Sequence, residues 1–144
     1  MYNVGAFFRT ADGVNLEKLL LCGITAHPPQ KGIAKTALGA EETVPWEHDW
    51  DVVHAARQAR TKGYQLVAIE TNPDAVDLFE WQPQFPLCVC FGHEVDGLHP
   101  EVLKLADAHV RIPMHGRKGS LNVATAGGVV LYELLRKYRA LEQK

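Results

Sequence analysis

The chain has 144 residues, of which 47% are hydrophobic and 22% charged, and its formal net charge at neutral pH is −2. These values are typical of one ordinary globular domain, and the negative net charge excludes a protein-wide basic field, so contacts with nucleic acid must come from local groups of lysine and arginine. No apolar run approaches the ~20 residues that a membrane span needs, so no membrane partner is expected.

The first third of the chain begins with a helix and a strand. Residues 4–12 carry apolar side chains at helical spacing, and the glycine that follows predicts the end of that helix. Residues 16–22 contain the run LLLC, which is typical of a buried strand. Residues 25–50 are punctuated by proline and glycine and are predicted to be irregular, apart from a short helix within residues 33–38.

The rest of the chain alternates between helices and strands. The segments YQLVAIE and LCVCF are apolar at nearly every position, as strands buried on both faces are. Strands separated by helices predict an α/β fold, with a mainly parallel sheet and helices on both faces. Helices are predicted over residues 51–62, 100–106 and 121–141, and strands over residues 64–70, 87–91 and 109–112.

A basic loop follows the last of these strands. The sequence there is IPMHGRKGSLNV, residues 112–123, in which two glycines bracket Arg117 and Lys118 and Ser120 stands where the last helix is predicted to begin. A tight loop between a strand and a helix N-terminus is a common place for anionic or nucleotide ligands in α/β proteins. The alternative is structural: Ser120 caps the helix, and the two cations belong to a solvated turn.

Two other segments carry polar residues suited to such a site. Gly92 and Gly97 bracket a loop directly after a predicted buried strand, and this loop could equally be an acidic surface turn. Asn3 and Arg9 lie at the two ends of the first predicted helix, where Asn3 could act as a cap and Arg9 could be merely solvated. No Gly-x-Gly-x-x-Gly or phosphate-loop pattern occurs.

The cysteines do not indicate a metal site. Cys88 and Cys90 are two residues apart on a predicted strand and therefore share one face, but this is not the spacing of a zinc knuckle. Buried thiols are common core residues, so no metal is expected. An odd total of three cysteines, with no leader-like N-terminus, favours the reducing cytoplasm.

A glycine pair interrupts the last predicted helix. Gly127 and Gly128 each cost roughly 1 kcal/mol relative to alanine, a cost that close backbone approach usually offsets. The approaching group is either a helix of a second subunit or the chain's own sheet.

Taken together, the three loops resemble the three signature motifs of the SpoU (TrmH-like) branch of the SPOUT RNA methyltransferases. NVGAFFRTA at residues 3–11 resembles the first motif, CFGHEVDG at residues 90–97 the second, and the segment from IPM at residues 112–114 to SLNV at residues 120–123 the third. The motifs occur in family order and span almost the whole chain. Because the first motif begins at residue 3, we expect either a catalytic domain over residues 1–144 without the family's usual first strand, or a clipped chain.

The resemblance implies a ribose 2′-O-methyltransferase that uses S-adenosylmethionine (SAM) and acts on tRNA or rRNA. It also implies a trefoil knot near the C-terminus and a homodimer with its active site near the subunit interface. Two other functions stay open: a SAM- or RNA-binding module without turnover, and a SPOUT enzyme that methylates a base.

The resemblance also implies roles for individual residues. Arg9 is placed at the reacting ribose, where arginine, as a poor general base, favours a role in positioning a phosphate or oxyanion. The resemblance assigns catalytic roles to Arg9, Asn3, Glu94, Ser120 and Asn122, and SAM binding to Gly92, Glu94, Gly97, Ile112, Met114, Ser120 and Leu121.

RNA would be held by local cationic patches, because no separate RNA-binding domain is recognised. Arg9 would contact RNA together with Lys31, Lys35, Arg117 and Lys118. A further group of cations, Arg57, Arg60 and Lys62, lies on the helix predicted over residues 51–62. Such contacts are salt-sensitive and carry little sequence information.

Overall fold

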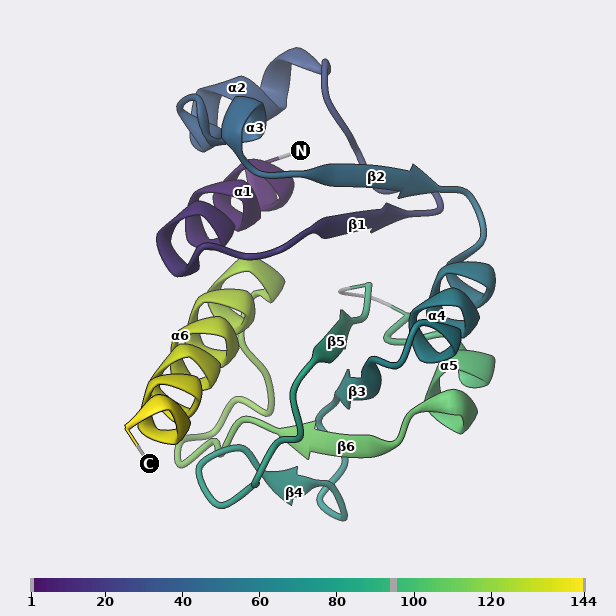
Figure 1. Ribbon diagram of the computed structural model, residues 1–144, viewed down its shortest axis with the longest axis vertical. Coiled ribbons are helices and arrows are strands. Elements are labelled where there is room, and N and C mark those ends of the chain that lie inside the picture. Colours follow the sequence, from purple (N-terminus) through teal and green to yellow (C-terminus); the bar gives the residue numbers. More distant parts are fainter. Residues whose placement is uncertain (1, 94–95, 144) are drawn as a thin grey trace.

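The computed structural model describes residues 2–93 and 96–143, which form helices packed around short parallel strands (Figure 1). Every pairing between the named strands is parallel, which confirms the predicted α/β class. The elements in chain order are α1 (Tyr2–Val14), β1 (Leu19–Cys22), α2 (Lys31–Ala37), α3 (Ala40–Thr43), β2 (Trp46–Asp49), α4 (Val52–Thr61), β3 (Gln65–Ile69), β4 (Val76–Asp77), β5 (Leu87–Phe91), α5 (Pro100–Leu105), β6 (Ala108–Arg111) and α6 (Val123–Glu142).

The larger sheet has the strand order β4-β6-β3-β5, and β1 and β2 form a separate pair. Helices cover both faces of the larger sheet, as predicted. On β3, Val67 packs in the cluster that includes Val130 of α6, and its neighbour Leu66 packs in the cluster with Ala56 of α4 and Val102 of α5. Because successive strand residues point to opposite faces, an unbroken apolar run is what this two-sided burial requires.

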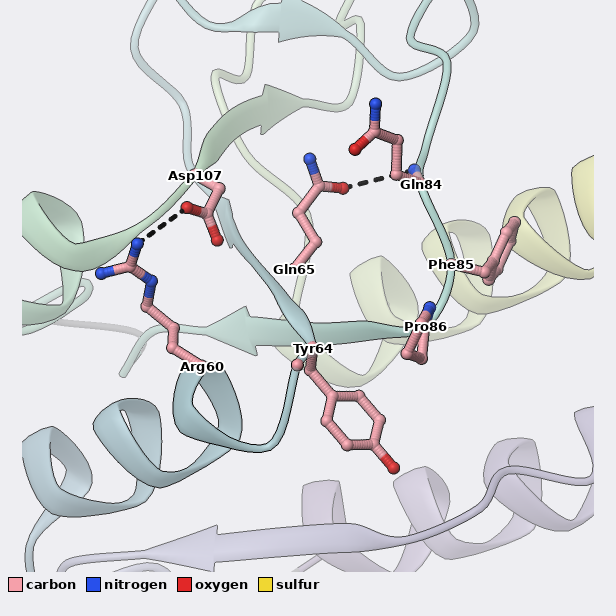
Figure 2. Close-up of a pocket in the computed structure, with 8 residues that line it drawn as sticks. Arg60, Tyr64, Gln65, Gln84, Phe85, Pro86 and Asp107 are labelled. Atoms are coloured by element: carbon pink, nitrogen blue, oxygen red, sulfur yellow. Dashed lines mark hydrogen bonds and ion pairs between the residues drawn. The ribbon is translucent and has the colours of Figure 1, made fainter.

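Side-chain hydrogen bonds and an ion pair stabilise the amino edge of the larger sheet (Figure 2). Asp107 accepts a hydrogen bond from the backbone N–H of Leu66 at 2.8 Å and forms an ion pair with Arg60 at 3.2 Å. The backbone N–H of Gln84 donates to the Gln65 side-chain oxygen at 3.3 Å. These bonds fix the start of β3 relative to the segments that lead into its two neighbours.

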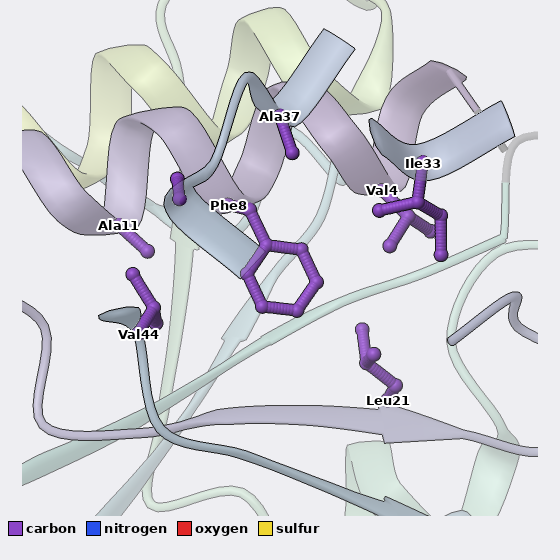
Figure 3. Close-up of a cluster of buried hydrophobic side chains, with 8 residues drawn as sticks. Val4, Phe8, Ala11, Leu21, Ile33, Ala37 and Val44 are labelled. Atoms are coloured by element: carbon purple, nitrogen blue, oxygen red, sulfur yellow. The ribbon is translucent and has the colours of Figure 1, made fainter. Parts of the chain in front are cut away.

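The N-terminal helices and β1 enclose a second core (Figure 3). Val4, Phe8 and Ala11 share one face of α1 at helical spacing, and Phe8 is fully buried in the cluster with Ile33 of α2. A Cβ atom on Gly5 would lie 2.6 Å from the carbonyl oxygen of Ile33, so α1 and α2 approach at backbone distance. Helix α1 therefore forms one wall of this core.

The prediction of an irregular segment over residues 25–50 is only partly correct. Helix α2 falls where a short helix was predicted, but α3 and strand β2 were not predicted, and neither was the two-residue β4 farther along the chain. Strand β2 has the sequence WEHD, which contains residues that are depleted in strands. Its extended conformation depends on parallel pairing with β1, which the local sequence does not reveal.

The structural alternative, in which Ser120 and Asn3 serve as helix caps, does not hold for either residue. Helix α6 begins at Val123, and its cap is Asn122, whose side-chain oxygen accepts from the N–H of Ala124 at 2.9 Å and of Thr125 at 3.4 Å. Ser120 therefore lies two residues before the cap. Helix α1 begins at Tyr2, so Asn3 lies inside its first turn and does not cap it.

The glycine pair in α6 has two different environments. A Cβ atom on Gly127 would lie 2.4 Å from the Phe7 ring of α1, whereas one on Gly128 would meet no described atom within 4 Å. Gly127 thus allows α6 to pack closely on α1 of the same chain, instead of on the sheet. No helix in the described part of the chain is long and apolar enough to cross a bilayer.

The two glycines of α6 should respond in opposite directions to alanine. Gly127→Ala forces the new methyl group into Phe7 and should lower the free energy of unfolding by about 1–3 kcal/mol, the usual cost of overpacking. Gly128→Ala adds helix propensity in open space and should raise it by about 0.5–1 kcal/mol. Denaturant titration measures both values, and equal effects at the two positions would contradict this packing.

The cap of α6 can be tested with its neighbour as control. Asn122→Ala leaves helix N–H groups without their acceptor and should lower the free energy of unfolding by about 1 kcal/mol. Ser120→Ala removes no cap and should change it by less than about 0.5 kcal/mol. Thermal or denaturant unfolding of the two variants distinguishes the residues, and a larger loss for Ser120→Ala would restore Ser120 as the cap.

Candidate functional site

The carboxyl ends of three neighbouring strands lie at one edge of the larger sheet. Strand β3 ends at Ile69, β5 at Phe91 and β6 at Arg111, and both outer strands pair in parallel with β3. The loops that follow these strands therefore emerge side by side, at the position where open α/β sheets bind ligands. Two of these loops are the ones predicted to carry a site.

A cavity of about 360 Å³ opens at this edge, within the size range of small-molecule sites. Two of the residues predicted to bind a cofactor, Ile112 and Met114, line it together with the predicted RNA-binding pair Arg117 and Lys118. The remaining lining residues are Thr71, Pro73, Arg111, Gly116 and Gly119.

The loop after β6 has an unusual supply of backbone donors and acceptors. Between Ile112 and Leu121, no backbone N–H or C=O group forms a hydrogen bond to another residue in the described ranges. In most of a folded chain, the backbone N–H and C=O groups form hydrogen bonds within helices and sheets. Ten consecutive residues with free backbone groups, beside a cavity, can bind a polar ligand without losing any internal bond.

The cavity carries positive charge. Arg111, Arg117 and Lys118 line it, and none of the described lining residues is acidic. The Arg111 side chain is also anchored, since its Nε–H donates to the carbonyl oxygen of Ala75 at 3.1 Å. A cavity of this kind favours an anionic group such as a carboxylate or phosphate.

The loop after β5 closes on itself through its two glycines. His93 N–H donates to Gly97 O at 3.1 Å and Gly97 N–H donates back to His93 O at 2.8 Å, with Gly97 at a φ of 70°. A Cβ atom on Gly92 would lie 2.5 Å from the carbonyl carbon of Gly97, so only glycine fits there. The predicted site residue Glu94 lies outside the described residues.

Helix α1 brings the first predicted motif next to this loop. The Phe7 ring contacts the Phe91 ring edge-on at 5.3 Å, one residue before Gly92. Asn3 and Arg9 are six residues apart and project about 120° from each other around the helix. Asn3 is half-buried, whereas Arg9 is exposed and has no hydrogen bond or ion pair within the described part of the chain.

The predicted residues therefore fall into separate groups. Ser120 and Leu121 continue the cavity loop and are exposed, and Asn122 ends it as the cap of α6. Lys31 and Lys35 are exposed on α2, which packs on α1. None of the residues predicted on α1 and α2 lines the cavity as described.

Thr71, Pro73 and Arg111 line the cavity but lie outside the loops predicted to carry a site. Thr71 and Pro73 follow the carboxyl end of β3, which is the same signal that identified the loop after β5. That signal was available in the sequence. The position of Arg111 depends on β6 lying next to β3, which the order of elements along the chain does not reveal.

A second hollow, of about 460 Å³, lies at the opposite, amino edge of the sheet (Figure 2). Its lining includes the bonded pairs described above, Arg60 with Asp107 and Gln65 with Gln84. These polar groups already form bonds with one another or with the backbone at the starts of the strands. The smaller cavity at the carboxyl edge is the better candidate for a ligand site.

The three cysteines are half-buried, and two of them pack against a core cluster. All three are free thiols, and Cys88 and Cys90 both face the cluster of α4 and α5. Burial, together with the nearby Asp49 carboxylate, raises the pKa of Cys22 to about 11, so this thiol stays protonated at neutral pH. No group of three or more His, Cys, Asp or Glu side chains in the described ranges is arranged to hold a metal ion.

Solved structures share this fold. The A. aeolicus TrmH/SpoU tRNA modifying enzyme aligns over 98% of this chain and 71% of its own, with a TM-score of 0.87 and 28% identity. An AdoMet-bound rRNA methyltransferase from Sinorhizobium meliloti aligns over 95% of this chain and 52% of its own, with a TM-score of 0.86 and 30% identity.

Curated sequences give the same relationship. The tRNA (guanosine(18)-2′-O)-methyltransferase of Escherichia coli K12 is 32% identical over 94% of this chain and 58% of its own length. A 23S rRNA (guanosine-2′-O-)-methyltransferase of Shewanella oneidensis is 31% identical over 96% of this chain and 56% of its own. The chain thus spans little more than half the length of these relatives.

The model of the SpoU rRNA Methylase family matches residues 1–132, which include all three motifs. The fold, the motif order and this match agree, and the chain belongs to the SpoU rRNA methylase family.

Proposed function

We propose that this chain is a SAM-dependent methyltransferase that modifies a ribose 2′-hydroxyl of tRNA or rRNA. The observation that carries the proposal is the cavity formed where the loops after β3 and β6 meet, with backbone groups in the loop after β6 that form no hydrogen bond to other described residues. It is supported by relatives named as 2′-O-methyltransferases and by a neighbour named as AdoMet-bound.

The residues at the carboxyl edge suit SAM. Ile112 and Met114 offer apolar surface, and the backbone groups between Ile112 and Leu121 can bind the polar parts of the cofactor. The glycines of the loop after β5 let its backbone come close. In this proposal the SAM-binding residues are Gly92, Glu94, Gly97, Ile112, Met114, Ser120 and Leu121.

The chain's own task is to hold the acceptor hydroxyl and to help its proton leave. When bound, SAM supplies a methyl group on a sulfonium that departs as a neutral thioether, so no metal is needed to stabilise a leaving anion. The Arg9 guanidinium offers N–H donors and no acceptor, so it suits the binding of an anionic oxygen. Its fixed charge suits the phosphate next to the ribose or the oxygen as it loses its proton, with Asn3, Glu94, Ser120 and Asn122 as positioning residues.

Two exposed groups of cations would hold the RNA: Lys31 and Lys35 on α2, and Arg117 and Lys118 at the cavity. Phosphate contacts of this kind weaken steeply as salt rises. An RNA substrate, together with the three free thiols, favours action in the cytoplasm.

A homodimer belongs to the same proposal. Arg9 is exposed and does not line the cavity of its own chain, so a second copy could bring its Arg9 to this cavity. Gly128 and the exposed side chains of Tyr132 and Tyr138 leave part of α6 open to such a copy. A trefoil knot formed by the C-terminal loops is likewise part of the proposal.

Arg9→Ala should abolish most methyl transfer while leaving SAM binding intact. Loss of a charge that acts on the reacting groups costs about two to three orders of magnitude in rate. The assay follows tritiated SAM with bulk tRNA and rRNA, and calorimetry measures SAM affinity. Lys104→Ala, an exposed cation on α5, is the matched control and should keep wild-type activity.

The product identifies the acceptor. A 2′-O-methyl group protects the adjoining phosphodiester from alkali, so alkaline digestion followed by mass analysis should release a resistant, labelled dinucleotide. Label on a base would instead make the chain a base methyltransferase. SAM and RNA binding without incorporation would make it a binding module, and full activity of Arg9→Ala would remove the role given to that residue.

A further inference from the structure

Trp50 presents an indole ring to solvent at a fixed corner of the chain. It stands between the end of β2 and the start of α4, and 75% of its surface is exposed. Figure 1 shows the short segment that joins these two elements. The corner is held because Asp51 N–H donates to Asp49 at 2.9 Å and the Asp51 side chain caps α4 by accepting from Val53 N–H at 3.0 Å. A ring of this size normally gains stability from burial, so its exposure on a rigid corner calls for a partner.

Aromatic rings support this indole from one side. His48 meets the Trp50 ring edge-on at 4.5 Å, His27 lies 4.4 Å from His48, and Trp46 stacks on His27 at 5.9 Å. The two imidazoles are tied to the backbone, because His48 Nε2 donates to Gly23 O at 2.8 Å and His27 Nδ1 donates to Pro28 O at 2.9 Å. The row of rings therefore limits the movement of Trp50 and leaves it one open side.

The outer face of α4 is cationic. Its buried face is formed by Ala55, Ala56 and Ala59, and the residues between Val52 and Thr61 include no aspartate or glutamate. Arg57 and Lys62, the latter at the C-cap, are exposed and form no ion pair with any described residue. Arg60, in contrast, is paired with Asp107.

Trp50 extends this face towards the N-terminus. Trp50 lies two residues before the first residue of α4, His54, Arg57 and Gln58 are exposed on the helix, and Lys62 is exposed at its C-cap. We call these five residues the α4 stripe. The two carboxylates near Trp50 are engaged: Asp49 accepts from the His54 ring at 2.7 Å, and Asp51 caps the helix. The stripe thus runs from an aromatic ring to free cations.

We propose that this stripe binds a single-stranded segment of RNA, with an unpaired base stacked on Trp50 and backbone phosphates on Arg57 and Lys62. The proposal rests on the proposed function, since it assigns a second contact surface to the same substrate. Aromatic rings bind the faces of unpaired bases, and cations along the same groove follow the phosphates. A protein partner fits less well, because interface cores are depleted of charge and apolar, whereas Trp50 is the only large apolar side chain named in this stripe.

The test is the affinity of the full chain for a short, unstructured, fluorescein-labelled RNA, measured by anisotropy over a range of salt concentrations. Trp50→Ala should weaken binding about 5- to 140-fold, the effect of one lost stacked base, and should leave the salt dependence unchanged. Arg57→Gln and Lys62→Gln should each weaken binding and should reduce the slope of log affinity against log salt by about 0.7.

Two controls match these variants. Phe79→Ala removes another exposed aromatic ring, 58% exposed in the segment after β4, and Lys104→Gln removes a cation that is already paired with Glu101. Both should bind the RNA as the wild type does. Circular dichroism and calorimetry with SAM verify that each variant folds and that its cofactor site is unaffected.

The proposal is overturned if Trp50→Ala binds RNA as tightly as Phe79→Ala, or if Arg57→Gln keeps the salt slope of Lys104→Gln. A change of oligomeric state in Trp50→Ala would also overturn it and would assign the corner to contact between copies. If the wild type transfers methyl groups but Trp50→Ala loses no affinity for RNA, the stripe is rejected and the proposed function is kept. The expected affinity losses without any methyl transfer would support the stripe and reject the proposed function.

Discussion

Parallel pairing of β3 with both β5 and β6 is the constraint on which the candidate site depends. Because the three strands run in one direction, the loops that follow them must open at one edge, and residues more than forty positions apart in sequence meet there. An antiparallel partner would send one loop to the amino edge, where the side chains of Asp107 and Gln65 are already committed to holding the strands.

Close packing of α1 on α6 is the second requirement. Gly127 lets the Phe7 ring approach the α6 backbone, and the same ring touches Phe91 at the end of β5. One aromatic side chain therefore ties the helix of the first motif both to the loop of the second motif and to the helix that follows the third.

The sequence predicted the parts of the fold whose signal is local. Strands β3 and β5 are apolar runs that reflect burial on two faces, and α4 has a clear apolar stripe. Strand β2 escaped prediction because its order comes from pairing with β1. The sequence could not distinguish Ser120 from Asn122 as the cap of α6, because serine and asparagine are both good caps. Arg111 was missed as a cavity residue because the order of strands in the sheet is a tertiary property.

Hydrogen exchange in the presence and absence of SAM tests the central claim most directly. If the carboxyl edge is the cofactor site, SAM should slow exchange in the loop over residues 112–121, whose backbone groups form no hydrogen bond to other described residues, and at Gly92 in the loop after β5. Protection confined to residues 63–65 and 84–86 would place the ligand at the amino edge instead. That result, or no protection anywhere in well-folded protein, would contradict the account.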